Sequence, residues 1–194
     1  MGIEFELKYS ATEAQLAAIR ENTPGQEQQF SMETTYYDTP SGSLSARHYT
    51  LRIRKENHIS VCTLKTPAPG GARQELEVEC DDILKALPEF CRQSDVQELP
   101  ILLQEGIVPV CGARFTRIAK TVVTDSCTLE LALDQGVLLG GGREVPLSEF
   151  EAELKDGTPE AAAAYAEEMA KTYGLKPEPR SKFHRARLLA EGKL

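Results

Sequence analysis

The sequence lacks tryptophan altogether, and aromatic residues make up only 6% of its 194 residues. It also lacks an apolar run long enough to span a bilayer, and its acidic N-terminus has no basic segment followed by an apolar one. The five cysteines are widely spread and form no C-x-x-C pair. We therefore expect a cytoplasmic protein without a membrane partner, whose cysteines are reduced thiols and not metal ligands.

Positive charge is also in deficit, since the formal net charge is −8. This balance argues against non-specific binding to nucleic acid or to an anionic membrane, although a local cluster of cations could still bind a small anion. A hydrophobic content of 41% and a charged content of 27% are typical of a globular protein. We predict a single domain over residues 1–194, with a helical insertion at about 81–110 and C-terminal helices at about 158–190.

The first segment alternates charged and apolar residues from position 3 to position 8, which is the period of a β-strand. One face of this strand carries Glu4, Glu6 and Lys8. Two neighbouring carboxylates repel each other, which indicates that a metal ion or another cation lies between them. The lysine on the same face indicates that an anion also binds there.

The same mixed-charge alternation recurs along the chain, in about seven strands in all. The further strands are predicted at 30–38, 48–55, 59–66, 73–80, 113–124, 127–134 and 145–155. For one strand alone, a sheet with a solvated polar face would explain the pattern. Helices predicted at 12–22, 82–105 and 158–190 can cover the apolar faces from outside, so the charged faces would line an interior. The expected fold class is α+β. If the sheet closes, roughly eight antiparallel strands give a β-barrel around a wet, charged lumen.

The lumen would hold cations and carboxylates together. Its predicted basic residues are Arg52, Arg54, Lys65, Arg73, Arg117 and Lys120. Its predicted acidic residues are Glu4, Glu6, Glu75, Glu77, Glu130, Glu151 and Glu153. This mixture suits a polyanion that binds together with divalent metal ions.

Nine segments in order resemble the CYTH superfamily, the triphosphate tunnel metalloenzymes. Glu4-Phe5-Glu6-Leu7-Lys8 is similar to the ExExK motif that opens this family. The other segments are Tyr36-Tyr37-Asp38-Thr39-Pro40, Leu51-Arg52-Ile53-Arg54, Thr63-Leu64-Lys65, Arg73-Gln74-Glu75-Leu76-Glu77, Arg117 with Lys120, Glu130 to Gly136, Glu151-Ala152-Glu153, and Ser181-Lys182. The resemblance extends from residue 4 to residue 182 and implies an eight-stranded tunnel that binds a triphosphate.

The resemblance also assigns roles to residues. It implies that Mg²⁺ or Mn²⁺ is held by Glu4, Glu6 and Glu153, with Glu130, Asp134 and Glu151 as ligands of a second metal or as groups that orient water. The implied phosphate-binding residues are Lys8, Arg52, Arg54, Lys65, Arg73, Arg117, Lys120 and Lys182. The implied catalytic residues are Glu4, Glu6, Lys8, Arg117, Glu130 and Glu153. Glu149 is expected at a tunnel mouth or in solvent, and Arg185 in solvent.

The predicted function is hydrolysis of inorganic triphosphate to diphosphate and phosphate, by a monomer or a homodimer. No base-recognition element is evident in the sequence. The alternatives are a class IV-type adenylate cyclase, a thiamine triphosphatase and a non-catalytic polyphosphate-binding module. The number of carboxylates argues against the last, because binding a polyanion does not by itself require negative groups.

Overall fold

The computed structural model describes the backbone of residues 2–69 and 73–194 and the side chains of residues 5–69 and 73–194. The described strands are β1 (Gly2–Glu4), β2 (Glu6–Ser10), β3 (Glu27–Asp38), β4 (Thr50–Glu56), β5 (Ile59–Pro67), β6 (Arg73–Glu79), β7 (Val108–Val123), β8 (Cys127–Gly140), β9 (Arg143–Gly157) and β10 (Lys176–Pro177). The helical elements are α1 (Glu13–Asn22), η1 (Ser45–Arg47), α2 (Ile83–Gln93), α3 (Leu99–Leu102), η3 (Leu103–Glu105), α4 (Pro159–Tyr173) and α5 (Lys182–Ala190). The predicted α+β class is confirmed.

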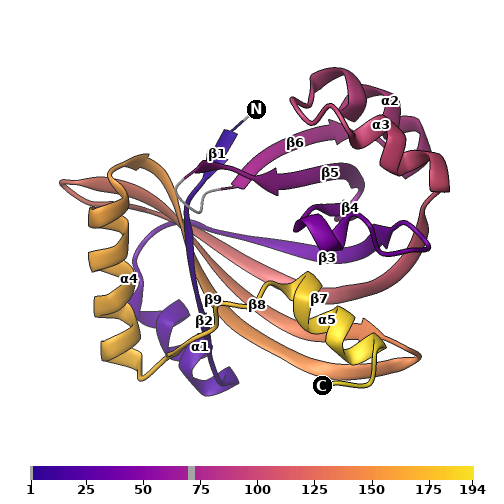
Figure 1. The fold of residues 1–194 in the computed structure, drawn as a ribbon. Helices are drawn as coiled ribbons and strands as arrows, with labels where there is room; N and C mark the ends of the chain where they lie inside the picture. Colours follow the sequence, from indigo (N-terminus) through magenta and orange to yellow (C-terminus); the bar gives the residue numbers. More distant parts are fainter. Residues whose placement is uncertain (1, 70–72) are drawn as a thin grey trace.

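The strands form one curved antiparallel sheet in the order β1-β6-β5-β4-β3-β7-β8-β9-β2-β10 (Figure 1). It has ten strands within the described residues, not the eight predicted. The predicted first strand is divided at Phe5, so that β1 pairs with β6 and β2 pairs with β9. Strand β10 has only two residues, which is too short for a hydrophobic pattern to reveal.

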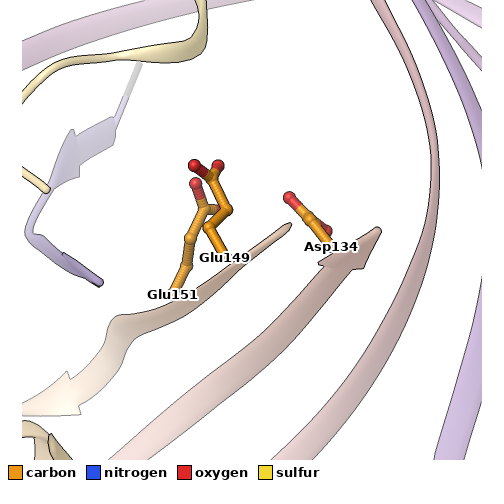
Figure 2. Close-up of side chains that lie close together, drawn as sticks. All are labelled: Asp134, Glu149 and Glu151. Carbon is orange, nitrogen blue, oxygen red and sulfur yellow. The ribbon is translucent and has the colours of Figure 1, made fainter. Parts of the chain in front are cut away.

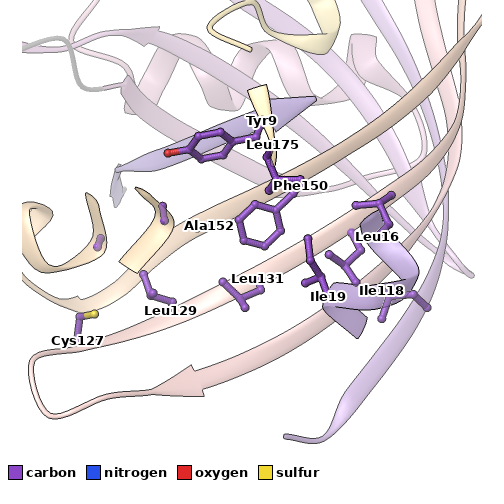
Figure 3. Packing of buried hydrophobic residues seen from close by; sticks show 13 residues of the cluster. Tyr9, Leu16, Ile19, Ile118, Cys127, Leu129, Leu131, Phe150, Ala152 and Leu175 are labelled. Atoms are coloured by element: carbon purple, nitrogen blue, oxygen red, sulfur yellow. The ribbon is translucent and has the colours of Figure 1, made fainter. Parts of the chain in front are cut away.

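The helices cover the apolar faces of the strands, as predicted. Leu16 and Ile19 of α1 and two alanines of α4 pack with Phe150 in one core, against β7, β8 and β9 (Figure 3). A capping box forms between Thr12 and Gln15 at the start of α1. The outer faces of these strands are therefore dry, and the charged residues are left to the opposite face.

A second core lies under the predicted insertion. Ile83, Ala86 and Phe90 of α2 pack with Leu99 and Leu102 of α3 and with apolar residues of β4, β5 and β6. No helix in the described part of the chain combines the length and the apolarity needed to cross a bilayer.

The last helix differs from the expectation that all helices pack outside the charged face. Ala186 of α5 packs with Met32, Leu138 and Leu147 in a third core. The first residues of α5 nevertheless reach the charged face, where Lys182 and Phe183 line a cavity. Close contact with the sheet requires glycine, because a Cβ at Gly140 would lie 2.4 Å from the carbonyl oxygen of Ala186.

Candidate active site

A cavity of about 400 Å³ lies on the charged face of the sheet. Strands β2 to β9 and the start of α5 all contribute to its lining. Its charged lining residues are Glu6, Lys8, Arg52, Arg54, Lys65, Arg73, Glu75, Glu77, Arg117, Glu130, Glu151, Glu153, Lys155 and Lys182. These are eight cations and six carboxylates, so the described lining has an excess of positive charge that favours an anionic ligand.

Most of the predicted site residues meet in this cavity. The exceptions are Glu4, Lys120 and Asp134. The side chain of Glu4 lies outside the described residues, although its backbone pairs with Arg73. Asp134 is fully buried just below the cavity. Lys120 lies elsewhere, so the structure does not support its predicted contact with substrate.

Lys120 points away from the cavity because it is three residues from Arg117 on β7, and alternate residues of a strand face opposite sides. Its ammonium group donates hydrogen bonds to the carbonyl oxygens of Arg20 at 2.5 Å and Thr23 at 2.8 Å. These carbonyls lie at the C-terminal end of α1, where a cation also interacts favourably with the helix dipole. Lys120 therefore attaches α1 to the sheet.

Three carboxylates converge at the base of the cavity. Asp134 on β8 and Glu149 and Glu151 on β9 point toward one another (Figure 2), and their oxygen atoms lie within 4.8 Å of one another. The ammonium of Lys182 lies among them, 2.7 Å from Asp134 Oδ2 and 2.8 Å from Glu151 Oε1, and it also contacts Glu149. Oxygen geometry alone would suit a metal ion, but an ammonium group already occupies the centre of this cluster.

Two arginines complete the base. Arg117 donates from Nε and Nη2 to the two carboxylate oxygens of Asp134, both at 2.7 Å, and from Nη2 to Glu151 at 2.5 Å. Arg185 forms an ion pair with Glu149. With Lys182, three cations thus match three buried carboxylates. Glu149 was expected at a tunnel mouth or in solvent and Arg185 in solvent, and both predictions are wrong. Helix α5 packs across β7, β8 and β9, and both side chains are buried.

The pKa shifts agree with a fixed ion-pair network. Burial lowers the pKa of Lys182, but Asp134, Glu151 and Glu149 outweigh burial and raise it above its ordinary value. Burial raises the pKa of Glu151, but Lys182 and Arg117 hold it well below its ordinary value. The pKa of Glu149 is raised by burial, with a further contribution from Glu151. Lys182 and Glu151 are therefore charged over a wide range of pH.

A second, more open row of carboxylates crosses three neighbouring strands. Glu6 of β2 is directly opposite Glu153 of β9, which is directly opposite Glu130 of β8. Facing residues of adjacent strands lie about 5 Å apart at Cβ. All three side chains line the cavity and are partly exposed. Partly solvated oxygen ligands at this spacing fit a hard divalent cation such as Mg²⁺ or Mn²⁺.

The opposite side of the cavity is basic. Arg52 and Arg54 of β4 and Lys65 of β5 line it, and Glu75 of β6 lies 3.4 Å from Arg52 and 3.3 Å from Lys65. Burial lowers the pKa of Arg54, and the neighbouring charge of Arg52 lowers it further, despite the contact with Glu56. Cations this close repel one another, so an anion between them would stabilise the site.

The aromatic side chains of the cavity are already in contact with other groups. Arg117 and Lys182 lie over the ring of Phe115, at 5.8 and 5.1 Å from its centroid. The rings of Tyr36 and Phe183 pack together at 5.1 Å. Among the described residues, Phe115 therefore packs against the cations Arg117 and Lys182, and Tyr36 and Phe183 pack against each other in the cavity wall.

Sequence reasoning missed Lys155, which lines the cavity 2.8 Å from Glu153. Its position on β9 in phase with Glu149, Glu151 and Glu153 was a usable signal. Arg185 was also detectable, because it is one helical turn after Lys182 and shares its face of α5.

Comparison with known proteins relates the chain to one family. The CYTH domain family matches residues 2–186. An inorganic triphosphatase of Haemophilus influenzae is 31% identical over 132 residues, which cover 67% of this chain but only 38% of that protein. The chain thus spans well under half the length of this relative.

Two solved structures share the fold over nearly the whole chain. HpAC1 from Hippeastrum, described as a candidate adenylyl cyclase with a dominant triphosphatase activity, superposes with a TM-score of 0.66 at 22% identity and covers 100% of this chain and 97% of its own. The PH1819 protein from Pyrococcus horikoshii OT3 superposes with a TM-score of 0.62 at 25% identity. The match covers 97% of this chain and 99% of that protein.

Proposed function

The chain belongs to the CYTH domain family, and on that premise we propose that it is a divalent-metal-dependent triphosphatase that cuts inorganic triphosphate to diphosphate and phosphate. One observation carries the proposal: a single cavity sets a cluster of cations on β4 and β5 against a row of carboxylates on β2, β8 and β9. A polyanion needs the cations, and a metal ion bound by the carboxylate row would join that row to the substrate.

The cavity is proposed to be a closed tunnel, as the family fold implies. The strand pairings support this, because β1 pairs with β6 while β2, one residue further along the chain, pairs with β9. A continuous N-terminal segment thus bonds to strands near both ends of the sheet order. A closed sheet also leaves no unpaired edge beside the charged interior.

The proposed ligands of the metal are Glu6, Glu130 and Glu153, with Glu4 added by its place in the ExExK motif. A divalent ion there would offset charge on the transferred phosphoryl group and hold the substrate in line for attack. Glu151 and Asp134 are not proposed as metal ligands, because Lys182 and Arg117 already neutralise their carboxylates in the buried base.

The cations are proposed to bind the phosphate chain. Arg52 and Arg54 can each present two parallel N–H donors to phosphoryl oxygens, and Lys8 and Lys65 supply point charges. The pKa of Lys8 is raised because Glu6 and Glu151 outweigh the effect of burial, so its ammonium stays charged near neutral pH. Arg117 is held rigidly by Asp134 and faces the cavity, where it would meet the leaving diphosphate.

Inorganic triphosphate is favoured over a nucleotide or thiamine triphosphate. Recognition of a base or a thiamine ring usually employs a free aromatic face. In the described lining, Phe115 is covered by Arg117 and Lys182, and Tyr36 packs against Phe183. The rest of the lining offers mainly charged donors and carboxylates.

The experiment that tests this proposal offers the purified protein triphosphate, ATP and thiamine triphosphate in turn, each with Mg²⁺ or Mn²⁺. Products are resolved as phosphate, diphosphate and cyclic AMP. We expect metal-dependent release of diphosphate and phosphate from triphosphate at the highest kcat/KM. Cyclic AMP as the dominant product would overturn the proposal, as would turnover that persists in excess chelator.

Variants of the carboxylate row sharpen the test. Glu6→Gln and Glu153→Gln remove a metal ligand each while nearly preserving shape, and each should reduce kcat/KM by at least about 100-fold. Glu168→Gln on the exposed face of α4 is the matched control and should retain the parent activity. Equal activity in all three variants would refute the assignment of the metal to this row.

A further inference from the structure

Lys155 lies at an irregularity in the pairing of β8 with β9. On β8, Thr128 is paired with Asp156 of β9 and the next residue, Leu129, is paired with Leu154. The register therefore skips Lys155, which is the extra residue of a β-bulge. Bulges change the direction of a side chain and are frequent beside active sites.

Strand alternation places Lys155 on the same face of β9 as Glu153, beside the open carboxylate row. Its ammonium lies 2.8 Å from Glu153 Oε1 and 3.8 Å from Glu130 Oε1, and its side chain lines the cavity. Glu130 and Glu153 face each other across adjacent strands, so their charges repel unless a cation lies near both. In the metal-free protein, Lys155 supplies that cation.

A lysine ammonium and a divalent ion compete for the carboxylate oxygens of Glu130 and Glu153, and each weakens the binding of the other. An ammonium group bonded to a carboxylate uses the lone pairs that a metal needs, and it repels the incoming ion. Unlike Lys182 in the buried base, Lys155 is well exposed and attached by a flexible stem, so it can move into solvent.

We propose that Lys155 competes with the divalent cation for Glu130 and Glu153 and thereby sets the metal affinity of the site. This inference rests on the proposed function, since it takes the carboxylate row as the metal site. The lysine keeps the carboxylates paired when the metal is absent and weakens metal binding when it is present.

The test measures binding of Mn²⁺ alone, without substrate, by the loss of the free-ion signal in electron paramagnetic resonance. Lys155→Met keeps most of the aliphatic stem but removes the charge, and it should lower the Mn²⁺ Kd about three- to tenfold, as expected for loss of a partly exposed ion pair and of charge repulsion. Lys155→Arg keeps the charge and should stay within about twofold of the parent protein.

The matched control is Lys85→Met on α2, which removes a lysine paired with Asp81 and Asp82 far from the cavity. Its Kd should not change. Thermal unfolding gives a second readout, because Mn²⁺ should raise the Tm of Lys155→Met more than that of the parent. An unchanged or higher Kd in Lys155→Met overturns the inference, as does equal tightening in Lys85→Met.

The failure of the inference can be told apart from the failure of the proposed function. If the parent protein binds Mn²⁺ and Lys155→Met binds it no more tightly, only the inference is wrong. If neither protein binds Mn²⁺, the carboxylate row is not a metal site and both are wrong.

Discussion

Removal of the Lys182 ammonium should destabilise the fold more than removal of any exposed charge. Lys182 contacts Asp134, Glu149 and Glu151, and its loss would leave three buried carboxylates facing two arginines. Removing one partner of a buried ion pair costs about 3–5 kcal/mol, because the remaining charge stays desolvated. Lys182→Met should therefore lower the free energy of unfolding by about 4 kcal/mol at pH 7, which corresponds to a fall in Tm of about 10 °C.

The pH dependence of this loss has a definite sign. The pKa of Lys182 is raised above 10.5 in the folded state, so the stability from its charge is complete below about pH 10.5 and is lost as pH rises through the folded value. The pKa of Glu151 is held below 4.5, so its contribution is complete above about pH 4.5 and is lost as pH falls. The difference between parent and variant should thus be greatest near neutral pH and should shrink both in acid and above about pH 10.

Urea denaturation followed by circular dichroism measures the difference, with Lys193→Met as a matched control whose lysine is exposed and paired with Glu191. That control should cost less than about 0.5 kcal/mol. Adding Asp134→Asn to Lys182→Met removes one of the unpaired carboxylates and should recover part of the loss. A Lys182→Met protein within about 1 kcal/mol of the parent, or a double variant as unstable as the sum of both changes, would refute the reasoning.

Three other predictions concern separate parts of the molecule. Lys120→Met should lower the free energy of unfolding by about 1–3 kcal/mol, because two carbonyls lose their donor, while KM for triphosphate stays unchanged in steady-state assays. Gly136→Ala should cost about 1–3 kcal/mol in urea denaturation, since its Cβ would lie 2.2 Å from the carbonyl oxygen of Arg114; a neutral result would contradict this close approach. Arg54→Lys should raise KM for triphosphate about tenfold without lowering Tm, and an unchanged KM would exclude a forked contact.

The sequence predicted the strands and helices well where alternation or capping was strong. The capping box of Thr12 and Gln15 and the cap at Thr158 mark the starts of α1 and α4 as observed. The alternation pattern did not predict the length of a strand where backbone pairing alone extends it. The predicted strand at 127–134 continues to Gly140, because residues there pair with β7 and β9 without a regular alternation.

Candidate site residues were predictable to the extent that strand phase determines the face. Arg117 reaches the cavity and Lys120 does not, although both fitted the resemblance, because three residues separate them on β7. Burial was less predictable, since it depends on which helix covers a strand. Glu149 is in phase with Glu153, but only the packing of α5 shows that it is buried with Arg185.

Strand β9 explains how one sheet can hold both a fixed and an exchangeable set of charges. The side chains on one face of β9 become steadily more exposed along the strand, from 0% at Glu149 to 9% at Glu151, 28% at Glu153 and 41% at Lys155. A metal that entered the deep end would have to displace the Lys182 ammonium from three buried carboxylates, which is costly. At the open end solvent screens the charges, so Lys155 can leave Glu153 at small cost. The buried carboxylates therefore hold Arg117 and Lys182 in place. The outer carboxylates Glu130 and Glu153 can exchange Lys155 for a divalent cation.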